Sequence, residues 1–383
     1  MDDLELAGSL KGKRMKILDL QPIPAQKGAW RARLMANGGR AQEFHLETDD
    51  GISPPDVLDG LALAALPVAM RGGFDLLRVH GPITHGALWR LLEYARIWHL
   101  WSPGHFHPTR IEPDQVLRGL APDPAGLALV AWSGSLHSSH TLIRMIEHRA
   151  VGTPAVGGVM RMTGLRRGDH AGIEAAREMI QAMGLRFHHI RTNARHAGMM
   201  DGRLGRLPMV AAAMHCLSGQ YNCGIHARGY PLAAQMIFPR PGPALPDLYS
   251  GDALAIRADG GVIPLPLAAR ALARYPVLAD MAGAAVSRCP RSEQTLVRLA
   301  FRAAGVAGRI DDWQDAIDAF LLPVGRGTIY CEARGICDHW TGSGHGVRKM
   351  LAARIRMGQI MMSVRDYGRW LLAMAHLRGV YPR

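Results

Sequence analysis

The sequence has no apolar run long enough to cross a membrane. A spanning helix needs about 20 consecutive apolar residues, whereas the best candidate, residues 207–217, is about half that length and contains His215. The first residues, Met1-Asp2-Asp3, do not form the basic segment followed by an apolar one that is typical of a secretory signal. We therefore expect a chain without a membrane span or a secretory leader.

Cysteine is scarce, because the chain has five cysteines, an odd number that is widely scattered. A disulfide framework is therefore not expected, and a reducing cytoplasm is the location that this pattern favours. Internal repeats and low-complexity tracts are also absent from the sequence. Apolar residues make up 48% of the chain and charged residues 20%, as is usual for a globular protein.

Acidic residues are outnumbered, with 32 Asp and Glu against 45 Lys and Arg, which gives a formal net charge of +13. Such a balance attracts phosphate groups on nucleotides, nucleic acids or anionic surfaces. The basic residues are dispersed and do not form a basic arm. The content of Arg, Ala and Gly also fits GC-rich coding, which is an alternative explanation for the excess of arginine. A nucleotide partner and a nucleic-acid partner both stay open.

The length of 383 residues predicts two or three domains. Residues 1–117 combine short β-like runs with two helical patterns, which indicates a small N-terminal α+β domain. The β-like runs are residues 15–20, 30–35, 42–46 and 75–79. The helical patterns are residues 54–70, with Ser53 as a candidate N-cap, and residues 84–100, with Thr84 in that role.

A linker rich in proline, residues 118–126, precedes a change of rhythm to alternating strands and helices. Strands are expected at residues 127–132, 156–162 and 185–191, with helices at residues 138–149, 172–183 and 207–217. Repeated strand–helix units predict an α/β domain with a parallel sheet over residues 126–305. Residues 306–383 read as a helical C-terminal region with a Gly-rich interruption at residues 325–346 and helices at residues 349–362 and 364–377.

The first strand of this α/β domain leads into Ser133-Gly134-Ser135-Leu136-His137-Ser138-Ser139 and then into a helix. Loop amides and a helix N-terminus present unpaired N–H groups and the positive end of a dipole, which together attract an anion. Hydroxyl groups from Ser133, Ser135, Ser138 and Ser139 would add donors. The alternative is an ordinary strand-to-helix turn with serine N-caps.

This loop resembles the Ser-Gly-Gly-x-Asp-Ser loop of the N-type ATP pyrophosphatases, the PP-loop group of the HUP superfamily. That superfamily includes 7-cyano-7-deazaguanine synthase, asparagine synthetase, GMP synthetase and tRNA-thiolating enzymes. Four later segments resemble the same group in the same order, and residues 62–81 resemble its N-terminal extension. The later segments are residues 141–144, 190–195, 209–217 and 245–250. The resemblance spans about residues 50–305.

The resemblance implies an adenine-nucleotide alpha hydrolase-like fold that binds ATP with Mg²⁺. It also implies an adenylating reaction in which a ligase or amidotransferase releases pyrophosphate before a nitrogen nucleophile attacks. The loop residues Ser133, Gly134, Ser135, His137, Ser138 and Ser139 would bind the nucleotide. Arg191, Asn193 and Arg195, at the end of a strand, would hold an anionic end of the substrate, because strand ends line the ligand crevice in such sheets.

The sequence departs from the family at two motifs. Ser135 replaces the second glycine of the loop, and His137 replaces its aspartate. The imidazole of His137 cannot serve as a hard-cation ligand, but it could pair with phosphate when it is protonated. The family's Cys-Gly-x-Cys-x-x-Cys run is reduced to Cys289. Three hypotheses follow: an active ATP-dependent enzyme, an inactive homologue that serves as a partner or regulatory subunit, and a protein that modifies tRNA or another RNA.

Zinc is a further hypothesis. Cys331, Cys337, His339 and His345 place four candidate ligands within fifteen residues, although their spacing matches no standard zinc finger. A looser set is His215, Cys216, Cys223 and His226. In both sets the alternative is an incidental grouping of cysteine and histidine.

Overall fold

The chain adopts an α/β fold in a computed structural model. The structure describes residues 15–24, 27–37, 39, 41–53, 55–102, 104–122, 126–147, 152–165, 169–170, 172–199, 206–228, 245–261, 263–287, 289–306, 319, 321–322, 327–341 and 345–357. These residues divide into two compact units. The first unit takes Met1–Ala131, Thr153–Ile225 and Ala244–Arg257, and the second takes Trp132–Gly152, His226–Pro243 and Ala258–Arg383.

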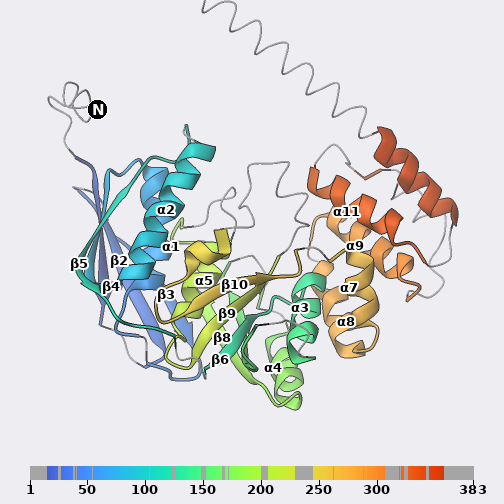
Figure 1. Cartoon of the computed structure of the whole chain (residues 1–383), viewed down its shortest axis with the longest axis horizontal. Helices are drawn as coiled ribbons and strands as arrows, with labels where there is room; N and C mark the ends of the chain where they lie inside the picture. The colour runs from blue at the N-terminus through green and yellow to red at the C-terminus, as the bar shows by residue number, and fades with distance from the viewer. Residues whose placement is uncertain are drawn as a thin grey trace, which may run out of the picture. The chain divides into compact units, whose positions relative to one another are not determined.

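A ten-stranded sheet in the order β10-β9-β6-β7-β8-β3-β2-β1-β4-β5 is the main feature of the fold (Figure 1). Its strands are β1 (Ile17–Ile23), β2 (Ala29–Ala36), β3 (Gln42–Thr48), β4 (Leu76–Thr84), β5 (Arg110–Leu117), β6 (Leu127–Ala131), β7 (Val156–Thr163), β8 (Arg186–Thr192), β9 (Tyr221–Ala227) and β10 (Ala255–Asp259). Strands β6, β7 and β8 pair in parallel, as do β1, β4 and β5. The pairs β1·β2, β2·β3 and β3·β8 are antiparallel.

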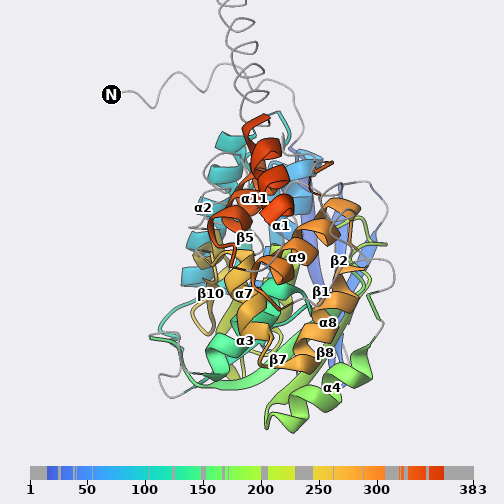
Figure 2. The ribbon, with the colours of Figure 1, turned by 90° about the vertical axis from the view of Figure 1, so that its right-hand side faces the viewer.

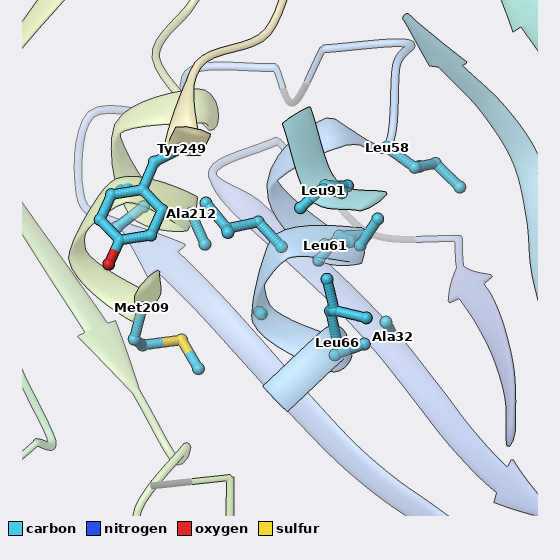
Figure 3. Close-up of a cluster of buried hydrophobic side chains, with 14 of the residues drawn as sticks. Ala32, Leu58, Leu61, Leu66, Leu91, Met209, Ala212 and Tyr249 are labelled. Atoms are coloured by element: carbon cyan, nitrogen blue, oxygen red, sulfur yellow. The ribbon is translucent and has the colours of Figure 1, made fainter. Parts of the chain in front are cut away.

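The core of the first unit forms between the sheet and three helices, α1 (Asp59–Gly72), α2 (His85–Trp101) and α5 (Leu207–His215). Helix α1 is buried along most of its length because Leu, Ala, Val, Pro and Met residues occupy ten of its 14 positions. It packs against α5 and α2. Figure 3 shows Leu61 and Leu66 of α1 with Ala212 of α5 and the ring of Tyr249 in this cluster. Helix α4 (Ile173–Ala182) connects β7 to β8.

The second unit is helical. It contains α3 (Leu136–Ile146), α7 (Leu265–Leu272), α8 (Pro276–Val286), α9 (Arg291–Ala303) and α11 (Gly327–Asp338). Helix α7 packs against α3, α8, α9 and α11, as the views of Figures 1 and 2 show. Residues 345–357 are also helical. Among the described residues, no helix is both long and apolar enough to cross a membrane.

The compact units differ from the domain boundaries that the sequence analysis places at residues 117 and 126. Strand β3 pairs with β8, with Leu46 opposite Thr192, so the N-terminal strands and the parallel strands share one sheet. A strand edge attracts a partner because its backbone groups need hydrogen bonds. Strands β5 and β6, which lie on either side of this segment in the sequence, therefore belong to one sheet.

Several predicted elements are confirmed, and others need correction. The predicted strands and helices between residues 127 and 217 are present, Thr84 caps α2, and Gly184 follows α4 with φ +75°. Helix α1 begins at Asp59 after Leu58, so Ser53 is not its N-cap. The Gly-rich interruption expected at residues 325–346 is wrong over Gly327–Asp338, because α11 lies there, with Ala333 and Ile336 buried at helical spacing. The helix expected at residues 364–377 lies outside the described residues.

Candidate functional site

The predicted strand–loop–helix unit is present as β6, a loop over residues 132–135, and α3. Gly134 has φ +78°, a left-handed conformation that glycine adopts without a steric penalty. Ser135 is the N-cap of α3, with extended backbone angles, and its side chain accepts a hydrogen bond from the amide of Ser138. The local sequence explains this turn, because serine favours the N-cap and glycine permits the sharp bend before it.

Three serine hydroxyls converge inside the loop. The Oγ of Ser138 lies 3.1 Å from the Oγ of Ser133 and 3.1 Å from the Oγ of Ser135. The amide of Ser133 donates to the Oγ of Ser138 at 3.2 Å, and that hydroxyl donates to the carbonyl of Ser135 at 3.0 Å. The loop is thus organised before any ligand binds. On binding, the hydrogen bonds among these hydroxyls would be replaced by hydrogen bonds to the ligand.

Ser139 faces the interior. Its side chain has no exposed area, and its Oγ accepts a hydrogen bond from the indole Nε1 of Trp132 at 3.0 Å. This bond satisfies a buried tryptophan N–H, which would otherwise cost free energy. We therefore assign Ser139 to packing at the start of α3, and not to the ligand-binding set in which the sequence analysis places it.

The first turn of α3 carries the groups that could hold an anion. The amides of Leu136 and His137 belong to this turn, where a helix has no internal acceptors for its N–H groups. This turn contains no acidic residue, so the positive end of the helix dipole is not neutralised from within α3. A methyl group built on Gly134 would lie 3.8 Å from the Cβ of Ala285 on α8, which places α8 beside the loop.

His137, which stands where the resembled family has aspartate, is mostly buried and faces a carboxylate. Its Nε2 lies 3.6 Å from the Oε1 of Glu332 on α11, and the side chain of Glu332 is 7% exposed. A buried carboxylate is costly unless a positive or donating group compensates it. The pair therefore links the loop to α11 inside the second unit.

Further along α3, the side chains that follow the loop are held by β10. Thr141 donates to the carboxylate of Asp259 at 3.0 Å, and the guanidinium of Arg144 lies 3.3 Å from the same carboxylate. His140 lies beside them, and burial lowers the pKa of its imidazole to about 4, with the charge of Arg144 acting in the same direction. His140 is thus a neutral side chain at pH 7. The contacts of Thr141 and Arg144 with Asp259 anchor α3 at residues beyond its first turn.

The substrate candidates lie in the first unit, with Arg191 inside β8 and Asn193 and Arg195 just after it, whereas the serine loop belongs to the second unit. Arg191 forms an ion pair with Asp49 at 2.9 Å, and Arg195 is exposed. The side chain of Asn193 joins β8 to β3: its Oδ1 accepts from the amide of His45 at 3.0 Å, and its Nδ2 donates to the carbonyl of Glu43 at 3.1 Å. Both ends of the Asn193 side-chain amide therefore bond the backbone of β3, which favours a structural role for this residue.

Two Asp–His pairs beside β8 have no counterpart in the sequence analysis. Asp50 contacts the Nδ1 of His188 at 2.5 Å, and the Nε2 of the same ring lies 2.6 Å from the hydroxyl of Tyr221. Asp49 lies 3.3 Å from the Nδ1 of His189. The two histidines are consecutive on a strand and therefore face opposite sides of the sheet. The doublets Asp49-Asp50 and His188-His189 were the available signal, but only the β3·β8 register joins them.

A cavity of about 450 Å³ lies at the carboxyl end of β8. It is lined by Asp49, His170, Gly172, Ile173, Glu174, Ala175, His189 and Arg191. Burial lowers the pKa of His189, and Asp49 opposes this effect. Both ring nitrogens of His189 already have partners, Asp49 and the hydroxyl of Thr163 at 2.9 Å. The cationic group of Arg191 is likewise engaged by Asp49, so the cavity offers a ligand few uncommitted side chains.

The zinc candidates do not converge. Cys331 and Cys337 both lie on α11, and six residues along an α-helix turn about 240°, which points their side chains in different directions. Burial raises the pKa of both thiols, that of Cys337 to about 11, whereas zinc binds the thiolate. His339 bonds the carbonyl of Gly335. Among the described residues, no group of three or more His, Cys, Asp or Glu side chains could hold a metal ion.

No family model matches this sequence, and neither the curated proteins nor the solved structures contain a match. Function is therefore inferred from the residues of the loop and from their contacts.

Proposed function

We propose that this chain is a PP-loop-type protein that binds the phosphate groups of an adenine nucleotide at the loop of residues 133–138. The observation that carries the proposal is the convergence at the start of α3: Gly134 in the left-handed conformation, the hydroxyls of Ser133, Ser135 and Ser138, and the amides of the first helical turn. All of these groups except the glycine donate hydrogen bonds, and a phosphate group accepts them.

The donor set of the loop fits a phosphate better than it fits Mg²⁺. Hydroxyl, amide and imidazole groups line the loop, and the carboxylate beside His137 belongs to Glu332, which is paired with that histidine. Mg²⁺ prefers oxygen ligands in near-octahedral geometry, usually including carboxylates. We therefore derive no step that passes through a metal ion. If the chain performs the adenylating reaction that its resemblance implies, the loop donors would stabilise the charge on the leaving pyrophosphate.

His137 favours a second candidate, a homologue that binds nucleotide without turning it over and acts as a partner or regulatory subunit. An imidazole replaces a carboxylate at the position where the resembled family has aspartate, and its ring is engaged by Glu332. This arrangement preserves phosphate binding while it removes an acidic group from the loop. The two candidates predict the same ligand and differ in whether the ligand is consumed.

Isothermal titration with ATP, with and without Mg²⁺, tests the shared prediction. Ser138→Ala removes the hydroxyl that contacts both other loop serines, and we expect its affinity for ATP to fall by about tenfold, the value of one hydrogen bond to a charged group. Ser287→Ala is the matched control, because Ser287 is exposed on the same unit and its hydroxyl donates to the carbonyl of Ala284 in its own helix. Absence of ATP binding in both conditions would remove the proposal.

A pyrophosphate-release assay separates the two candidates. An active enzyme would release pyrophosphate from ATP in the presence of its acceptor, and the release would fall in Ser138→Ala. A noncatalytic homologue would bind ATP in the titration and return it unchanged. Recovery of intact ATP after prolonged incubation with cell-derived small molecules would therefore support the regulatory candidate, and stoichiometric pyrophosphate would contradict it.

A further inference from the structure

Glu332 is a buried acid next to a site that is otherwise suited to anions. Its carboxylate lies 3.6 Å from the imidazole of His137, and its side chain is 7% exposed. His137 is in the first turn of α3, the turn whose amides would receive a phosphate. The negative charge of Glu332 therefore lies where a negatively charged ligand would also be attracted.

The position of Glu332 is set by the packing of α11. Ala333 and Ile336 have no exposed area, and α11 packs against α7 and α9. The apolar face of α11 therefore brings the carboxylate to His137, and the contact with His137 adds to the packing that holds α11 in place. Because like charges repel strongly where the dielectric constant is low, this carboxylate opposes the entry of phosphate into the loop.

We propose that Glu332 is an internal competitor of the phosphate ligand, so that α11 restrains phosphate binding at the loop and withdrawal of its carboxylate strengthens it. The inference rests on the proposed function. The carboxylate pairs with His137 when the loop is empty of ligand, and a bound phosphate takes over that imidazole. The affinity of the loop thus depends on where α11 holds Glu332.

Titration of the full chain with inorganic pyrophosphate tests this inference. Glu332→Gln keeps the shape of the side chain and removes its charge, and we expect it to bind pyrophosphate about tenfold more tightly than the natural sequence, within the usual range of coupling between sites. Asp338→Asn is the matched control, because it removes an acidic charge from the same helix at an exposed position paired with Arg334. Its affinity should equal that of the natural sequence.

A second measurement uses the unaltered protein and therefore does not depend on the folding of a variant. Hydrogen exchange of residues 331–338 should become faster when pyrophosphate is added, because the ligand displaces the side chain that links α11 to the loop. Unchanged or slower exchange in α11, at saturating pyrophosphate, would contradict competition.

The outcomes distinguish this inference from the proposed function. Equal affinity in Glu332→Gln and the natural sequence, together with weaker binding in Ser138→Ala, would overturn the competitor role and leave the phosphate site intact. No binding of pyrophosphate or ATP in any variant would overturn both. Tighter binding in Glu332→Gln that Ser138→Ala does not weaken in the double variant would place the ligand elsewhere and also overturn both.

Discussion

Asp59 offers the sharpest test of the physical reasoning. This carboxylate is 2% exposed at the start of α1, and it accepts two hydrogen bonds from Thr84, from the amide at 2.8 Å and from the hydroxyl at 2.7 Å. Thr84 is fully buried and caps α2, so Asp59→Ala leaves two interior donors without their acceptor. We expect the free energy of unfolding to fall by about 3 kcal/mol, near the lower part of the range for two unsatisfied buried groups.

The lower part of that range applies because the carboxylate is itself costly to bury. Desolvation raises the pKa of Asp59, and the nearby His215 and the bonds from Thr84 oppose that rise without cancelling it. Removing Asp59 therefore also removes an unfavourable buried charge. Asp59→Asn, which keeps one acceptor oxygen, should lose about half as much stability.

Urea unfolding followed by circular dichroism measures these changes, and hydrogen exchange in α1 and α2 localises them. Asp114→Ala is the control, because its side chain is 58% exposed and a surface change of this kind is expected to stay within about 0.5 kcal/mol. A free energy of unfolding for Asp59→Ala within about 0.5 kcal/mol of that control would refute the argument from unsatisfied donors.

Three further predictions concern His226, Gly164 and Asn193. Burial lowers the pKa of His226 from 6.5 to about 4, so the unfolded chain takes up a proton first as pH falls, and stability should decline between pH 6.5 and pH 4. His226 accounts for about 3 kcal/mol of this decline, which should therefore be smaller by that amount in His226→Leu, as urea unfolding at several pH values would measure; an equal decline in both proteins would contradict the prediction. Gly164→Ala should unfold at a much lower temperature than Gly172→Ala, because both have positive φ but only Gly164 would place its new methyl group against a neighbouring carbonyl; equal melting temperatures would count against this. Asn193→Ala should lower the free energy of unfolding by about 2 kcal/mol without changing ATP affinity, whereas lost affinity at unchanged stability would restore its role as a substrate residue.

Much of the parallel part of the sheet could be predicted because each element carries its own local signal. Strand β6 is a continuous apolar run, and α4 ends before Gly184. Strand β9 was not predicted, because its sequence Tyr-Asn-Cys-Gly-Ile-His-Ala mixes polar and apolar residues although all but the last are buried. The burial of β9 on both faces depends on the elements that surround it in the fold, and the local sequence pattern does not predict it.

The loop was predictable from the sequence, whereas its surroundings were not. The conformational preferences of Gly134 and Ser135 predict a strand-to-helix turn. The contact between His137 and Glu332 joins residues that are far apart in the chain, and the pairing of Asp49 with His189 spans 140 residues. Both depend on how distant elements pack or register. A local pattern can therefore propose a site but cannot say which charges surround it.

The interleaving of the two compact units constrains how the chain can be made and divided. The second unit takes an early segment that contains α3, and then two segments that begin near the ends of β9 and β10. Glu147, just after α3, receives a hydrogen bond from the hydroxyl of Tyr275 across 128 residues. During synthesis α3 emerges well before α7 and the other helices that cover it, so its apolar face stays uncovered until they are made. No single cut of the chain would yield both units whole, and a truncation that stops before α7 would leave the serine loop on an uncovered helix.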